Sequence, residues 1–129
     1  MAEAAFGIFL RLLRERRDLS LRELGRLAEV DHAYIHRLET GTKESPSPEV
    51  LGKLGRALKA NKRDSEILAL LATLSQVPPE MGEFLALDPS VTPVEVKALA
   101  GFAFRGKRTS YQELLQRIRA FLAEEEGNG

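Results

Sequence analysis

The chain has 129 residues, of which 43% are apolar and none is cysteine, and its 19 basic and 19 acidic residues balance to zero net charge. This length supplies one modest core or two small ones. The absence of cysteine excludes disulfides and thiolate metal sites, and it favours a reducing, cytoplasmic location. No apolar run reaches the length needed to span a membrane, and the first residues lack the charge order of a signal peptide, so we expect no membrane partner.

The zero net charge hides an asymmetry between the two halves of the chain. Through Arg63 there are 13 Lys and Arg residues against 9 Asp and Glu, whereas from Asp64 onward there are 6 against 10. The first half is therefore the one suited to contact phosphates.

Apolar residues recur at three- and four-residue spacing along the whole chain, without the alternation typical of strands, so we expect an all-α protein. The first helix is expected near residues 4–17, with Phe6, Phe9, Leu10 and Leu13 facing inward. Further helices are expected within 20–41, over 48–59 and from a cap at Asp64 or Ser65 to about 74, then near 80–87, 93–104 and 111–125.

The sequence of residues 20–41, SLRELGRLAEVDHAYIHRLETG, predicts a helix-turn-helix. Two short amphipathic stretches meet there with almost no linker. Ser20, with Glu23 three residues on, is a cap for the first helix, Asp31 can cap the second, and Gly41 supplies a left-handed stop. The expected inner positions are Leu21, Leu24, Leu27 and Ala28 on the first helix, and Val30, Ile35 and Leu38 around the second.

A helix-turn-helix inserts its second helix into the major groove of DNA, where exposed side chains read base edges. The side of this helix opposite its apolar residues carries His32, Ala33, His36 and Arg37, which we expect to contact bases. The residues expected to flank the groove and meet phosphate or sugar are Arg22, Arg26, Tyr34, Thr42 and Lys43.

Two other functions, a metal site and an enzyme active site, are less well supported by the sequence. His32 and His36 have the spacing of two metal ligands on one helical face, but zinc needs three or four protein ligands and the chain has no further histidine. We therefore expect no metal and no cofactor. An enzyme is not expected either, because no nucleophile, base and orienting group converge in any segment.

Gln76, Val77, Pro78 and Pro79 interrupt the helical pattern and mark the best domain boundary. We expect a DNA-binding domain over 1–75 and a small helical domain over 76–129. The fifth helix is apolar nearly all round, so it should also pack against the second half or another subunit. In the last helix an apolar stripe makes a candidate dimer interface, formed by Leu114, Leu115, Ile118, Phe121 and Leu122.

From about residue 6 to 60 the chain resembles the Cro/CI (XRE) family of bacterial and phage repressors, in the arginine-bearing first helix, the capped second helix and the recognition helix ending in Glu39, Thr40 and Gly41. The resemblance implies a five-helix DNA-binding domain and a partly buried pair between Arg14 and Glu39. The chain departs from the family pattern at Asp18 and Glu29, where glycine is usual, and at Gly25, where alanine is usual.

The segment DPSVTPVEVKALAGFAFRGKRTSYQELLQRIRAFL is similar to the C-terminal half of the DdrO-type radiation and desiccation response repressors. That resemblance implies a three-helix dimerisation domain, a homodimer on a palindromic operator, and repression of DNA-damage or stress response genes. It also implies inactivation by an IrrE-type metalloprotease between Phe104 and Arg105, in the loop near 104–108. The alternative is an antitoxin-like or phage-type regulator whose C-terminal helices bind a partner protein.

Overall fold

The computed structural model of the chain describes residues 4–41, 46–74, 77–103 and 110–127. These ranges contain helices and no strand, which confirms the all-α prediction. In chain order the helices are α1 (Ala5–Arg16), α2 (Leu21–Ala28), α3 (His32–Thr40), α4 (Pro48–Ala57), α5 (Lys62–Thr73), α6 (Pro79–Leu87), α7 (Pro93–Ala103) and α8 (Tyr111–Gly127). Within the described part of the chain, no helix is both long and apolar enough to cross a membrane.

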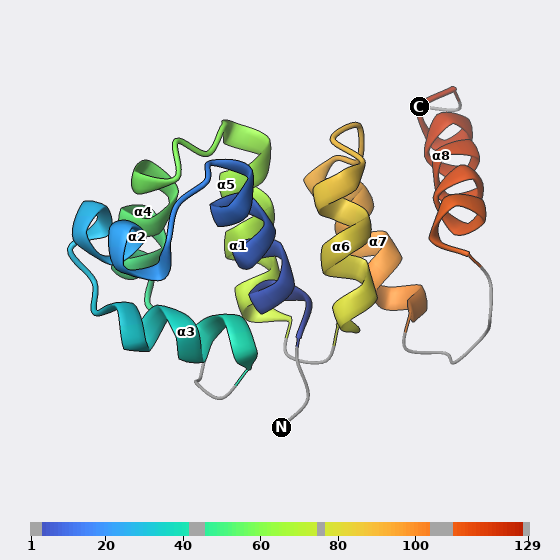
Figure 1. Ribbon diagram of the computed structural model, residues 1–129. Coiled ribbons are helices and arrows are strands. Elements are labelled where there is room, and N and C mark those ends of the chain that lie inside the picture. Colours follow the sequence, from blue (N-terminus) through green and yellow to red (C-terminus); the bar gives the residue numbers. More distant parts are fainter. Residues whose placement is uncertain (1–3, 42–45, 75–76, 104–109, 128–129) are drawn as a thin grey trace.

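Helix α1 lies at the centre of the molecule, with α2 to α4 on one side and α6 to α8 on the other (Figure 1). It packs against α3 and α5 and also against α6. Its predicted inward residues are buried, and so are Ala5, Gly7 and Ile8, because α6 covers a second side of the helix. Gly82 allows this close approach, since a Cβ there would lie 2.5 Å from the Ala5 carbonyl oxygen.

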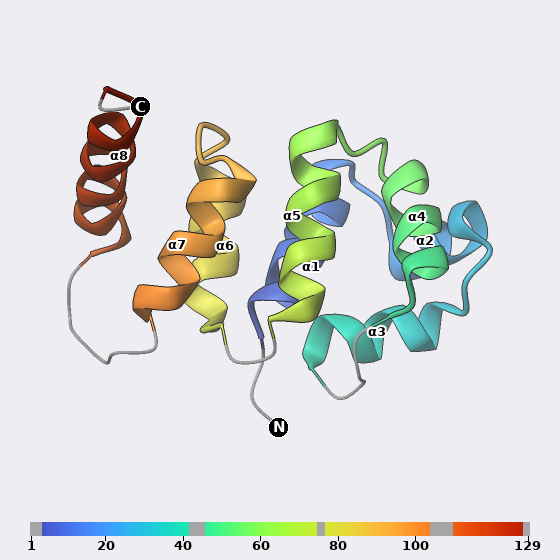
Figure 2. The same cartoon turned by 180° about the vertical axis from the view of Figure 1, so that it is seen from behind.

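One hydrophobic cluster runs through both halves of the chain and includes Leu71 of α5, Met81 of α6 and Leu99 of α7. As expected for its apolar surface, α5 packs against the second half of the chain through α7 (Figure 2). The division at residue 75 stays a prediction. What the structure adds is that the helices on either side of that point share a continuous core.

The prediction that Asp64 or Ser65 caps the fifth helix is wrong. Asn61 is the N-cap, and its Oδ1 accepts a 2.7 Å hydrogen bond from the backbone N–H of Asp64. Asp64 therefore lies in the first turn, where its buried carboxylate accepts a 2.8 Å bond from Arg63 and a 3.4 Å bond from Arg16. Asn61 and Asp64 are both good N-cap residues by type. Because Arg63 and Arg16 bind the Asp64 carboxylate, Asn61 is the residue that caps the helix.

Two arginines hold the C-terminal end of α6 against the first half of the chain. Arg63 donates to three backbone carbonyls, at 2.9 Å to Leu85, 2.8 Å to Asp88 and 2.9 Å to Val91. Arg16 adds a 3.0 Å bond to the carbonyl of Ala86. Carbonyls in the last turn of a helix have no partner within the helix and carry its negative dipole end, so cationic donors suit them.

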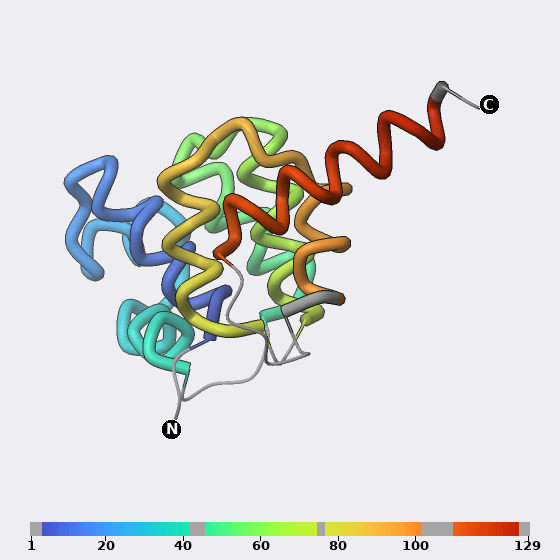
Figure 3. The backbone as a smooth tube through the Cα atoms, turned by 90° about the vertical axis from the view of Figure 1, so that its right-hand side faces the viewer, coloured from blue at the N-terminus to red at the C-terminus, as the bar shows by residue number. Residues whose placement is uncertain are grey.

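Helix α8 packs on α7, and its last turns extend away from the body of the molecule (Figure 3). A bidentate ion pair joins the helices, with Arg119 donating to Glu95 at 2.9 and 3.2 Å. At the start of α8, Tyr111 stacks on Phe84 with ring centroids 5.5 Å apart. Helix α7 begins at a capping box, because Thr92 and Glu95 each accept a bond from the backbone N–H of the other.

Candidate nucleic-acid interface

The first helix of the predicted motif begins at a complete capping box. The Ser20 hydroxyl accepts a 3.0 Å bond from the Glu23 N–H, and the Glu23 carboxylate accepts a 2.9 Å bond from the Ser20 N–H. The bond that the Ser20 backbone N–H donates to the Glu23 carboxylate lowers the pKa of Glu23. Because the box satisfies two backbone donors that the helix cannot, the position where α2 begins is fixed by local sequence.

The turn between α2 and α3 is tight and passes through Glu29, which is left-handed with φ 56°. Its closing bond runs from the Val30 N–H to the Gly25 carbonyl at 3.0 Å. A Cβ on Gly25 would lie 2.7 Å from the Val30 carbonyl oxygen and 3.2 Å from the His32 backbone nitrogen. The glycine therefore lets the chain fold back closely, while Glu29 adopts the conformation for which the family pattern uses glycine.

Helix α3 begins and ends at the predicted residues. Asp31 is its N-cap and accepts a 3.1 Å bond from the Ala33 N–H, and Gly41 ends it with φ 80°. Ile35 and Leu38 are buried in the core as expected. One inner position of the preceding helix is not, because Leu27 keeps 52% of its surface exposed. Its position on α2 places the Leu27 side chain on the side of the helix that faces α4 rather than the core.

A partly buried ion pair fastens α3 to α1, as the family resemblance implies. Arg14 donates to Glu39 in a bidentate arrangement, with Nε to Oε2 at 2.7 Å and a second bond at 3.0 Å. The Arg14 and Glu39 side chains are 12% and 4% exposed. Arg14 also donates to the Leu19 carbonyl at 2.8 Å, so it joins the loop before α2 to the same point. The bond to Glu39 raises the pKa of Arg14.

With its inner side fixed in this way, α3 presents an outer face to solvent. All four predicted base-reading residues are exposed, and they lie together on that face: His32, Ala33, His36 and Arg37. Arg22 and Arg26 are exposed on α2, and Tyr34 is half-buried. Thr42 and Lys43 lie outside the described residues. The arrangement can present donors, acceptors and a methyl group to a groove, and the individual contacts stay predictions.

The two histidines do not meet further metal ligands in the described part of the chain. Among these residues no group of three or more His, Asp or Glu side chains is placed to hold a metal ion. His32 instead lies beside Asp31, with Nδ1 3.9 Å from Oδ1.

The predicted residues of the C-terminal half divide into three groups. Phe104 and Arg105, at the expected cleavage site, lie outside the described residues, between the end of α7 and the start of α8. Leu115 and Ile118 are buried within the chain itself. The outer part of the stripe consists of half-buried Leu114 and Leu122 and of Phe121, which is 60% exposed.

The fold and this geometry together define a class, a helical protein built around a helix-turn-helix. Residues 5–70, about half of the 129, match the family described as a helix-turn-helix domain. The chain belongs to this family.

Two known proteins are similar over part of their length. The HTH-type transcriptional repressor RghR of Bacillus subtilis (strain 168) is 42% identical over 55 residues, which are 43% of this chain and 41% of that protein. The chain thus spans less than half of the length of this relative. The crystal structure of the clp gene regulator ClgR from C. glutamicum aligns with 57% of this chain and 91% of that one, at 32% identity and a TM-score of 0.46.

Proposed function

We propose that this protein is a sequence-specific DNA-binding transcriptional repressor that reads its operator with the outer face of α3. The observation that carries the proposal is the division of α3 into a face locked to α1 and a solvent face of His32, Ala33, His36 and Arg37. Membership of the helix-turn-helix family and the similarity to a repressor support it. Arg22 and Arg26 on α2 flank this face and suit the neighbouring phosphates.

The test is a loss of preference for the operator over random duplex, rather than a loss of DNA binding as such. The operator is first selected from a random duplex library with the wild-type protein, and operator and random duplex are then compared in competition. The double variant His36→Ala with Arg37→Ala should lose the preference, since each good base contact contributes about 1–3 kcal/mol of discrimination. Lys97→Ala, which removes an exposed cation from α7, is the matched control. Unchanged preference in the double variant would refute the assignment of the reading face.

The phosphate contacts have a different signature. Arg22→Ala with Arg26→Ala should weaken binding to operator and random duplex alike and reduce the slope of log K against log salt by about 2. A selective loss of operator binding would instead place these arginines at base edges.

We further propose that the protein acts as a homodimer on a palindromic operator of stress response genes. The resemblance of the C-terminal half to DdrO-type repressors supports this, and so does the exposed part of α8 around Phe121. Two half-sites about 34 Å apart then bind one dimer, and linking them raises the effective affinity about 10²–10⁴-fold. Analytical ultracentrifugation of the full chain tests whether the dimer forms. Binding to a DNA duplex with a single half-site gives the affinity for DNA without the gain from dimerisation.

The last part of the proposal is inactivation by an IrrE-type metalloprotease between Phe104 and Arg105. Such a cut breaks the chain between α7 and α8, leaving α8 held by its packing, by the Glu95–Arg119 pair and by the bonds from Arg119 to Ser90. Burial of Leu115 and Ile118 contributes about 1.5–3 kcal/mol each, which is too little to retain a free helix against dilution. Incubation with the protease and its metal should yield the two fragments by mass and remove the dimer. Full-length protein after complete exposure would refute the cleavage and leave DNA binding untouched.

A further inference from the structure

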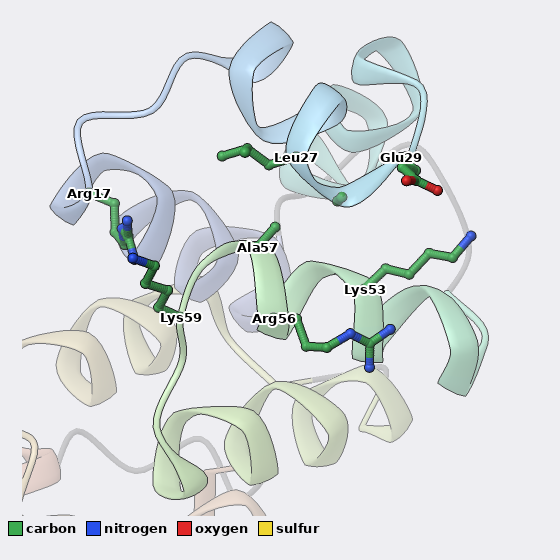
Figure 4. Close-up of a pocket in the computed structure, with 8 residues that line it drawn as sticks. Arg17, Leu27, Glu29, Lys53, Arg56, Ala57 and Lys59 are labelled. Atoms are coloured by element: carbon green, nitrogen blue, oxygen red, sulfur yellow. The ribbon is translucent and has the colours of Figure 1, made fainter.

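A groove of about 530 Å³ lies between α2 and α4, at the end of the molecule away from α8 (Figures 1 and 4). The apolar residues that line it are Leu27, Ala28 and Ala57, and Leu27 lies above Ala57 in the view of Figure 4. Its remaining residues are four cations and one carboxylate: Arg17, Lys53, Arg56, Lys59 and Glu29. A surface that combines exposed leucine with an excess of positive charge is costly to leave bare, because the leucine prefers burial and the cations repel one another.

The cations of the groove are only partly used within the chain. Lys53 lies 3.8 Å from Glu49, which is 80% exposed, and Arg17 donates to the Leu58 carbonyl in a long 3.4 Å bond. Arg56 and Lys59 are exposed and form no ion pair with any described residue. The groove therefore has positive charge to offer an anionic partner.

The groove does not belong to the proposed DNA surface. Gly25 faces α3, since a Cβ there would touch Val30 and His32. Leu27 lies two residues further along α2, about 200° around the helix axis, and so faces away from α3. Binding of DNA to α3 therefore leaves the groove open and does not explain its cations.

The end of α8 has the complementary chemistry. Glu124, Glu125 and Glu126 are exposed in its last turns, and Phe121, 60% exposed, lies on the same face as the first two. No basic residue occurs in the last turn, although the negative end of the helix dipole disfavours carboxylates there. These turns extend from the body of the molecule (Figure 3), at the end opposite the groove, so they cannot reach the groove of their own chain.

We propose that the last turns of α8 from one copy of the chain dock in the α2–α4 groove of a second copy. Phe121 then covers Leu27 and Ala57, and the glutamates lie beside the cations. The inference rests on the proposed homodimer and specifies the surface that α8 meets. Two such contacts related by a two-fold axis close the dimer, and the basic half of each chain pairs with the acidic half of the other.

Charge reversal and its compensation test this docking by sedimentation equilibrium. The tail variant Glu124→Lys, Glu125→Lys, Glu126→Lys and the groove variant Lys53→Glu, Arg56→Glu should each raise the dimer Kd at least about tenfold. Mixing the tail variant with the groove variant should restore association, because each then finds opposite charge on the other. Glu83→Lys and Lys97→Glu, at exposed positions of α6 and α7, are the matched controls and should leave the Kd unchanged.

Other outcomes overturn the inference in distinguishable ways. If the wild type is dimeric and neither variant changes its Kd, α8 pairs with some other surface and only the groove assignment fails. If the wild type stays monomeric at tens of micromolar, the homodimer fails as well. The wild-type Kd must also rise with salt between 50 and 500 mM, a measurement that needs no variant, and an unchanged Kd would refute the docking. Half-site binding by α3 is unaffected in every case.

Discussion

The ion pair between Arg14 and Glu39 should be worth more than an ordinary surface pair, and a double-mutant cycle measures it. Both side chains are largely buried and joined by two short bonds, so removal of either partner leaves the other charge without compensation. A fully buried pair costs about 3–5 kcal/mol when broken in this way, and the 12% exposure of Arg14 reduces the expectation to about 2–4 kcal/mol.

The two single variants should differ. Arg14→Met leaves a carboxylate that is 4% exposed without its partner and also removes the bond to the Leu19 carbonyl, whereas Glu39→Met leaves an arginine that can move toward water. Arg14→Met should therefore cost about 1 kcal/mol more. The double variant should cost less than the sum of the singles, with a coupling free energy of about 1.5–3 kcal/mol.

Urea unfolding followed by circular dichroism gives the four free energies of unfolding that the cycle needs. Lys97→Met, at an exposed site on α7, controls for the loss of a cation and should change the free energy by less than about 0.5 kcal/mol. Additive effects of the two single variants would show that the pair is not coupled, and the fastening of α3 to α1 would then depend on apolar packing alone.

Three further predictions concern the C-terminal helices. Gly82→Ala should destabilise the protein by about 1–3 kcal/mol because its Cβ would collide with α1 backbone, whereas Gly101→Ala, which meets nothing within 4 Å, should be neutral or stabilising by up to about 1 kcal/mol; equal melting temperatures would contradict the close packing of α6 on α1. Arg63→Met should lower unfolding stability by about 2–4 kcal/mol and speed amide exchange at the end of α6, and unchanged exchange there would refute its role. Burial alone would raise the pKa of Glu95, but bonds from Arg119 and Thr92 hold this pKa below its usual value. The ionised Glu95 therefore contributes its full share of folding stability above the ordinary pKa of about 4.3, and this stability is lost as the pH falls through the lower pKa of the folded state. NMR of the Leu115 methyl groups should show α8 loosening in that acid range, and a similar titration in Glu95→Gln would assign the effect to another group.

Local signals made the helix-turn-helix predictable. Ser20, Asp31 and Gly41 act within three or four residues of their own position, so their chemistry determines where α2 and α3 begin or end whatever the rest of the chain does. The outer face of α3 followed as the complement of its apolar positions. Leu27 shows the limit of that reasoning, because a helical period gives a direction but not the extent of the core.

The contacts across the chain were not predictable in the same way. The long-range partners of Arg63 are backbone carbonyls 22 to 28 residues away, and every residue type has a carbonyl, so no sequence pattern marks them. Similarly, the apolar stripe of α8 gave no indication that Leu115 and Ile118 are covered by their own chain while Phe121 is left outside. That division depends on the angle at which α8 crosses α7.

Helix α1 is a structural member common to both halves of the protein. One of its surfaces meets α3, where Gly7 brings it close to the Leu38 carbonyl, and another meets α6 at Gly82. Recombination with a related protein at the junction around Pro78 and Pro79 would therefore remove α6 from the surface of α1, or replace it with a helix that does not fit that surface. Exchange of parts between related proteins during evolution therefore has to carry α1 and α6 together, which ties the C-terminal half of the chain to the particular helix-turn-helix with which it evolved.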